Sequence, residues 1–194
     1  MTEGRGQIRS FIAIQIPDTV KALIRDLQGK LKKHGIHASF ANSENLHLTL
    51  KFLGNIHSED IKILEKSMDK AVTGILPHTL FASGIGVFPS VKHTRVIWSG
   101  IRGETDILEK LASGLESVLF KEMGLKREEK KFRPHLTLAR IKKPVAPDTV
   151  IKLIKAFENF QTPDFLVSGI GLFQSELSSF GAIHKQISFT LLEH

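Results

Sequence analysis

The sequence has no cysteine among its 194 residues. Disulfide bonds, thiolate metal sites and a cysteine nucleophile are therefore excluded. A chain without cysteine fits a reducing compartment, and we expect the protein in the cytoplasm.

Long apolar runs are also missing. No stretch approaches the roughly 20 apolar residues that a membrane-spanning helix needs, so no membrane association is expected. The first ten residues, MTEGRGQIRS, have no apolar segment of the kind found in secretory signals. The last three residues, Leu192–His194, resemble the start of a vector-encoded tag, and we give His194 no functional weight.

Metal-binding patterns are absent as well. No group of histidine and carboxylate residues shows the spacing of a metal site, such as two histidines four apart on a helix with a glutamate between them. We therefore expect neither a metal nor an organic cofactor.

Positive charge is in excess. The chain carries 27 Lys and Arg against 20 Asp and Glu, a formal net charge of +7. Such a balance is compatible with a merely soluble basic surface, but it also favours an anionic partner, usually one that carries phosphates. The basic residues gather at 30–35, 125–133 and 139–144.

Hydrophobic periodicity predicts alternating strands and helices. Strands are expected at 8–16, 46–54, 79–88, 94–101, 133–140, 163–177 and 184–192, and helices at 17–35, 58–74, 104–124 and 147–157. This mixture predicts an α+β protein. We expect 1–194 to form a single bilobal domain, a monomer.

Two short sequence motifs each occur twice along the chain, in the same order both times. HLTL stands at 47–50 and again at 135–138, and SGIGVFPS at 83–90 returns as SGIGLFQS at 168–175. Between each HLTL and the following SGIG lies one predicted helix. The repeat predicts two similar, pseudo-symmetric lobes, each an antiparallel sheet with helices packed on one face. The SGIG words lack a full dinucleotide-binding fingerprint and are interpreted as bends between strands.

Alternation along a strand divides the HLTL words into two faces. His47 and Thr49 share one face, and Leu48, Leu50 and Phe52 are expected to share the other, in the core. His135 and Thr137 repeat the pattern. A single His-x-Thr is more often structural than functional. Two copies in a matched repeat instead predict two imidazoles facing one cleft, where one removes a proton and the other donates one.

The paired words and their flanks resemble the 2H phosphoesterase superfamily, which is named for two His-x-Thr/Ser-x motifs. More narrowly, LHLTLKFLG and FRPHLTLAR resemble the RNA 2′,3′-cyclic phosphodiesterases of bacteria and archaea, historically called 2′-5′ RNA ligases. The resemblance also covers RSFIAIQIP, RVIWSGI and the closing GLFQSELSSFGAIHKQISF.

The resemblance implies a bilobal α+β fold with a water-filled cleft between the lobes and no metal. It implies that His47 protonates the departing 3′ oxygen and that His135 activates water. Thr49 and Thr137 would hold the nonbridging phosphate oxygens. The residues themselves do not decide which histidine is the acid, and the roles exchange with the direction of the reaction.

Two arginines are further candidates for phosphate contacts. Arg140 follows the second motif, where the family often has a basic residue. Because Arg140 lies five residues after His135, it needs a strand end or a β-bulge to reach the histidine face. Arg95 is the second candidate, and a solvated surface position is an equally good interpretation of it.

The expected substrate is RNA that ends in a 2′,3′-cyclic phosphate, tRNA-like fragments included, which is opened to a 2′-phosphomonoester. The resemblance also implies reverse 2′-5′ ligation. Two alternatives stay open: a non-catalytic RNA-binding module, and a phosphodiesterase acting on a small cyclic nucleotide or a 2′-5′ oligoadenylate.

Overall fold

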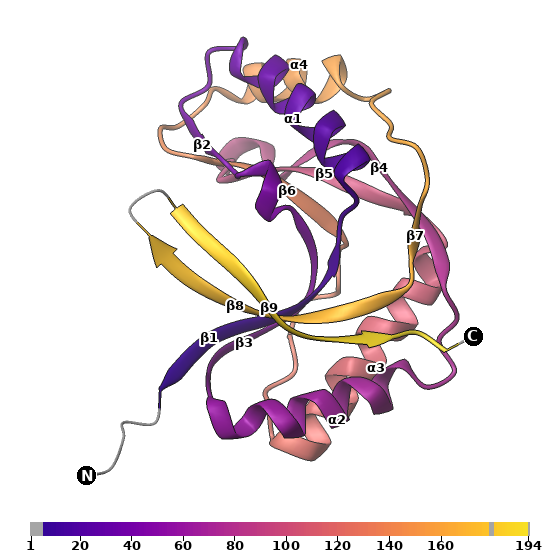
Figure 1. Cartoon of the computed structure of the whole chain (residues 1–194). Coiled ribbons are helices and arrows are strands. Elements are labelled where there is room, and N and C mark those ends of the chain that lie inside the picture. Colours follow the sequence, from indigo (N-terminus) through magenta and orange to yellow (C-terminus); the bar gives the residue numbers. More distant parts are fainter. Residues whose placement is uncertain (1–5, 179–180, 194) are drawn as a thin grey trace.

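The computed structural model describes residues 6–178 and 181–193 of the chain. Within this part, nine strands form two antiparallel sheets (Figure 1). Sheet A has the order β3-β1-β8-β9, and sheet B the order β2-β6-β5-β4-β7. The strands are β1 Gln7–Gln15, β2 Ala38–Phe40, β3 His47–His57, β4 His78–Phe88, β5 Val96–Gly103, β6 His135–Ile141, β7 Phe165–Val167, β8 Gly169–Ser178 and β9 Gly181–Leu191.

Four α-helices cover these sheets in pairs. They are α1 Asp18–Lys32, α2 Ile61–Val72, α3 Thr105–Met123 and α4 Pro147–Ala156. Helices α2 and α3 pack on each other, and α3 also contacts β3 of sheet A. Helix α1 contacts β6 and α4 contacts β4, both in sheet B (Figure 1). The predicted α+β fold with two lobes is therefore confirmed.

The expected elements are present with a few differences. The strand expected at 163–177 is split into β7 and β8, and three 3₁₀ turns and the short strand β2 were not predicted. The interpretation of the SGIG words as bends between strands is wrong for the first word, which lies entirely within β4 around a register shift between Ser83 and Gly86. The second word begins at Ser168, the residue between β7 and β8, and continues into β8.

The two sequence repeats exchange strands between the lobes. The first repeat places its HLTL word on β3 of sheet A but its SGIG word on β4 of sheet B. The second does the reverse, with HLTL on β6 of sheet B and most of SGIG on β8 of sheet A. In each sheet one further strand, β1 or β5, lies between the two words. Neither lobe is therefore formed by a continuous stretch of chain.

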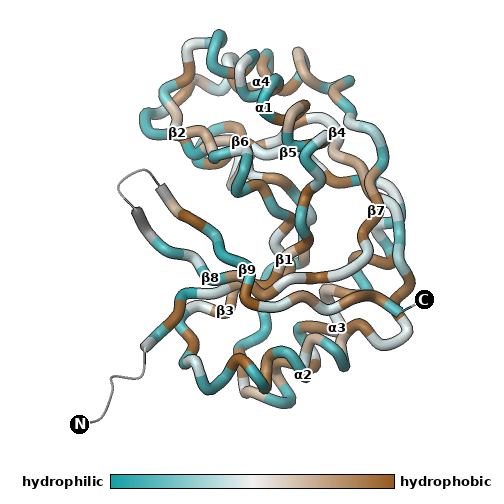
Figure 2. Tube along the Cα trace, viewed as in Figure 1, coloured by the Kyte–Doolittle hydropathy of each residue, from teal (hydrophilic) through white to brown (hydrophobic). Residues whose placement is uncertain are grey.

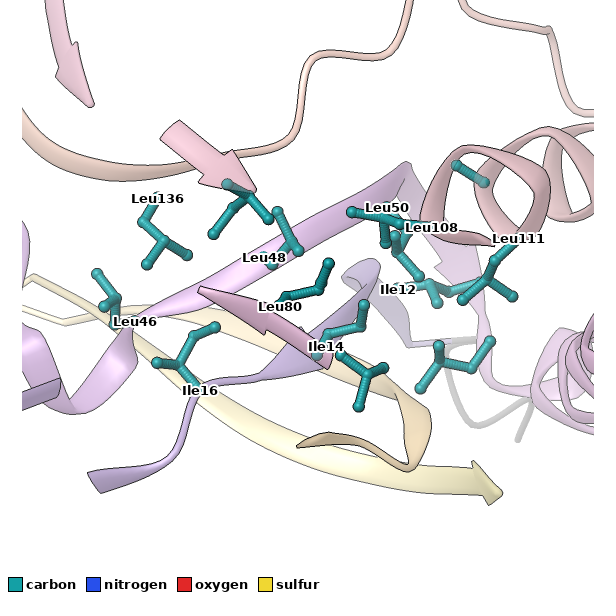
Figure 3. Packing of buried hydrophobic residues seen from close by; sticks show 14 of the residues in the cluster. Ile12, Ile14, Ile16, Leu46, Leu48, Leu50, Leu80, Leu108, Leu111 and Leu136 are labelled. Atoms are coloured by element: carbon teal, nitrogen blue, oxygen red, sulfur yellow. The ribbon is translucent and has the colours of Figure 1, made fainter. Parts of the chain in front are cut away.

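One hydrophobic core joins the two sheets. Leu48 and Leu50 of β3 and Leu136 of β6 belong to the same buried cluster, and the two strands contact each other (Figure 3). Hydrophobic and hydrophilic residues alternate along the strands and helices, as expected for elements that bury one face (Figure 2).

Two residues near the C-terminus pack against the fold. Leu192 is buried in the core, and the carboxylate of Glu193 accepts a hydrogen bond from the backbone N–H of Gly74. These two residues are thus part of the fold, although their sequence resembles the start of a tag. His194 and residues 1–5 lie outside the described residues. Among the described helices, none is long and apolar enough to span a membrane.

Glycine at one position of the repeated SGIG word makes room for a tryptophan. Gly86 lies directly opposite Trp98 in the register of β4 and β5. A Cβ atom added at Gly86 would lie 2.3 Å from the Trp98 ring, which is far inside van der Waals contact. The ring therefore occupies the space above the glycine.

We predict that Gly86→Ala destabilises the protein by about 1–3 kcal/mol, because the Trp98 ring must move. Gly29→Ala is the matched control: this glycine lies inside α1 and an added Cβ would meet nothing within 4 Å. There alanine should stabilise the helix by roughly 0.5–1 kcal/mol. Urea unfolding midpoints of both variants measure the difference, and equal midpoints would contradict this packing account.

Candidate functional site

A β-bulge follows the first His-x-Thr motif. Thr49 lies opposite Ala13 and Lys51 lies opposite Ile12, so Leu50 has no partner on β1. Alternation shifts by one residue at this point. Leu50 and Lys51 are both buried, whereas Phe52 is 61% exposed. The prediction that Phe52 belongs to the core face is therefore wrong: the bulge returns it to the face of His47 and Thr49.

The second motif is followed by a bulge at the equivalent position. Thr137 lies opposite Trp98 and Ala139 opposite Ile97, which leaves Leu138 without a partner on β5. Leu138 and Ala139 are both buried, and Arg140 is exposed. Arg140 thus returns to the face of His135 and Thr137, as the sequence required of it. Phe52 and Arg140 occupy corresponding places, each five residues after its histidine.

Each motif histidine is held by a hydrogen bond of the same kind. Nδ1 of His47 donates to the carbonyl oxygen of Asn45 at 2.7 Å, and Nδ1 of His135 donates to that of Arg133, also at 2.7 Å. A carbonyl oxygen only accepts, so each Nδ1 carries the hydrogen and Nε2 of the neutral ring is the free base. These two hydrogen bonds therefore fix the same tautomer of the neutral imidazole at both motifs.

Aromatic rings pack around His47 on its face of sheet A. Phe11 lies 4.5 Å from the His47 ring centroid and stacks on Phe173 at 5.3 Å. His184 of β9 meets the His47 ring edge-on at 5.0 Å. A pocket of about 140 Å³ opens here, and His47, His184 and Phe173 are among its lining residues. A larger pocket, of about 340 Å³ at the start of α1, includes neither motif histidine.

His135 has a different aromatic neighbourhood on sheet B. Phe88 meets its ring edge-on at 5.0 Å, and the Trp98 centroid lies 6.2 Å away. Phe88 and Trp98 are themselves in contact at 5.0 Å. The two motif histidines therefore share their backbone anchor but differ in the ring beside them.

Burial changes the proton affinity of both imidazoles. Desolvation lowers the pKa of His47 from 6.5 to about 4, opposed by the Asn45 hydrogen bond and assisted by the nearby His184. The pKa of His135 is also lowered, mainly by burial, with a contribution from the positive charge of Arg140. Both rings therefore favour the neutral form when nothing is bound.

The remaining candidate is placed differently. Arg95 is exposed and precedes β5 by one residue. Val96 and Trp98 lie opposite Arg140 and Thr137. Alternation therefore assigns Arg95 to the other face of the sheet.

Sequence reasoning missed Phe52 and His184. Phe52 carried a signal in hindsight, because its place in the first word matches that of Arg140 in the second. His184 carried none, since its approach to His47 depends on the pairing of β9 with β8 in sheet A. In residues 6–178 and 181–193, no group of three or more His, Asp or Glu side chains could hold a metal ion.

Comparison with known proteins assigns the chain to a family. The family model described as LigT-like phosphoesterase matches residues 14–98 and 102–184, which together include both motifs. A relative from Thermotoga maritima, named RNA 2′,3′-cyclic phosphodiesterase, is 34% identical over 92% of this chain and 92% of its own length. A relative of the same name from Methanothermobacter thermautotrophicus is 30% identical over 93% of this chain and 97% of its own.

Solved structures agree. TT0787 of Thermus thermophilus superposes with a TM-score of 0.78 at 25% identity, covering 95% of this chain and 98% of the other. E. coli LigT in complex with 3′-AMP gives a TM-score of 0.75 at 24% identity, covering 97% and 100%, and it supports the fold. With the family model spanning both repeats, the chain belongs to the LigT-like phosphoesterases of the 2H superfamily.

Proposed function

We propose that this phosphoesterase hydrolyses RNA 2′,3′-cyclic phosphate ends to 2′-phosphomonoesters, with His47 and His135 acting on the two sides of one phosphate. The observation that carries the proposal is the matched pair of imidazoles. Each has Nδ1 tied to the carbonyl two residues before it, each leaves Nε2 free, and each is on a strand that contacts the other. The relatives named RNA 2′,3′-cyclic phosphodiesterase support this choice of substrate.

The proposed step moves one proton at each imidazole. His135 accepts a proton from water as the water oxygen bonds to phosphorus. The bond from phosphorus to the 3′ oxygen breaks, and His47 donates a proton to that oxygen. The products are a 2′-phosphomonoester and a free 3′-hydroxyl. A 5′-hydroxyl end in place of water would lose its proton to His135 in the same way and give a 2′-5′ linkage with a free 3′-hydroxyl. In the reversal of either step the two histidines exchange their roles.

The remaining residues on these faces bind rather than transfer protons. Thr49 and Thr137 donate hydroxyl hydrogens to the nonbridging oxygens, and Arg140 adds a positive charge beside His135. Phe52 on β3 has an exposed ring that is suited to stacking on a nucleobase. The proposed reaction needs no metal, because the hydroxyl and guanidinium donors stabilise the negative charge that develops on the phosphate.

Removal of either imidazole should separate catalysis from binding. We predict that His47→Ala and His135→Ala each lower kcat by about 10²–10⁴, the usual effect of losing a positioned acid or base. Thr49→Ala and Thr137→Ala should each cost about 1.5–3 kcal/mol in kcat/KM, one hydrogen bond to a charged group.

The measurement is turnover of a short RNA with a 2′,3′-cyclic phosphate end, and its affinity is measured in parallel. His34→Ala is the control, because this exposed histidine belongs to neither motif and its ring meets that of Phe157 edge-on. A non-catalytic RNA-binding module would bind this RNA without turning it over. Near-normal turnover of His47→Ala would mean that the repeated word is structural.

The pH dependence should differ between the free protein and the substrate complex. One imidazole must be neutral while the other is protonated, so both profiles should be bell-shaped. In the free protein both pKa values lie below 6.5, which places the optimum of kcat/KM on the acid side of pH 6.5. The bound phosphate anion favours imidazolium, so the kcat profile should move to higher pH. A kcat/KM optimum above pH 6.5 would contradict this assignment.

Chelation should leave activity intact. We predict the same turnover in EDTA as in its absence, since the proposed step uses two imidazoles and no Lewis acid. Loss of turnover in EDTA that Mg²⁺ or Zn²⁺ restores would overturn the metal-independent mechanism.

A further inference from the structure

A buried lysine, Lys51, directly follows the first motif on β3. Strand alternation alone would place Lys51 with His47 and Thr49, on the face where a substrate phosphate is proposed. The bulge at Leu50 turns it inward instead, and its side chain is only 4% exposed. Burial of an ammonium group costs free energy unless the group is paired and hydrogen-bonded. The partners of Lys51 therefore indicate its role.

The partners of Lys51 lie on α3 and on the loop that connects α3 to the second motif. Its Nζ lies 2.8 Å from Oε1 and 3.0 Å from Oε2 of Glu116, on α3. It also donates to the carbonyl oxygen of Lys126 at 2.8 Å. The same Glu116 carboxylate accepts from the backbone N–H of Glu128 at 3.2 Å. One lysine and one glutamate thus hold the backbone of residues 126 and 128.

This backbone runs directly to the second histidine. Residues 124–134 connect α3 to β6 without a helix or strand of their own. At their end, the carbonyl oxygen of Arg133 accepts the hydrogen bond that orients His135. A loop lacks the hydrogen-bond ladder of a sheet, so its position depends on side-chain anchors of this kind.

We propose that Lys51 is a positioning residue that couples the two motifs: carried on the strand of His47, it fixes the loop that presents His135. The inference rests on the proposed function for its effect on turnover, but the coupling itself is a property of the protein without substrate. The equivalent residue after the second motif is Ala139, which is fully buried and has no charge to anchor a loop. Position 139 therefore provides no counterpart of the Lys51 anchor.

Trypsin provides a direct test, because the loop contains cleavable bonds after Lys126, Arg127, Lys130 and Lys131. In Lys51→Met we expect cleavage in this loop to accelerate at least 10-fold under native conditions. We also expect kcat to fall about 10-fold or more, with KM changed less than 3-fold, and the ring NMR signals of His135 to shift. Lys51→Arg keeps the charge and the donors and should restore most of the protection and the turnover.

The control is Lys70→Met, which removes the more exposed 3.0 Å ion pair between α2 and Glu122 of α3. It should change neither the cleavage of the loop nor kcat. Because Lys51→Met leaves Glu116 without its cation, the double variant Lys51→Met/Glu116→Leu keeps the core neutral and provides a second folded test.

Cleavage and NMR need no substrate, so they decide the coupling even if the RNA is not turned over. The proposal is overturned if the loop stays protected and the His135 signals stay in place in the folded single or double variant. It is also overturned if kcat falls while the loop remains protected, because Lys51 would then act by another route.

Discussion

The burial of leucine from both HLTL words in one core is the constraint on which the site depends. Leu48 and Leu136 are fully buried in a cluster that both sheets share (Figure 3). A strand that buries alternate residues must direct the others away, so each His-x-Thr pair is turned out of the core. The core therefore fixes the faces of the histidines before any substrate is present.

The exchange of strands makes each lobe depend on both repeats. Sheet A joins the first HLTL word to the second SGIG word, and sheet B joins the other two. The loop before His135 is anchored in turn by Lys51, which follows the first motif on β3. In the coupling that we propose for Lys51, a change in one half reaches the histidine of the other, which would suit the proposed reaction of two imidazoles at one phosphate.

Much of this was predictable from sequence, because the repeat and the strand period are local signals. They predicted the elements, the two lobes and the polar faces of the HLTL strands. The positions of the bulges could not be predicted from the sequence, because the partner strand decides which residue is left unpaired. For this reason Phe52 was misplaced, while the need for a bulge at Arg140 could be stated in advance. The contact of His184 with His47 joins strands far apart in the chain, and no local pattern reports it.

Titration of the protein with a 2′-phosphorylated nucleotide, observed through the imidazole NMR signals of His47 and His135, tests most directly whether the two histidines act on one phosphate. The account predicts that both sets of signals move together and report a single dissociation constant. It also predicts that the pKa of both rings rises in the complex, because the phosphate is negatively charged. Movement of one histidine while the other keeps its free position and pKa would contradict it.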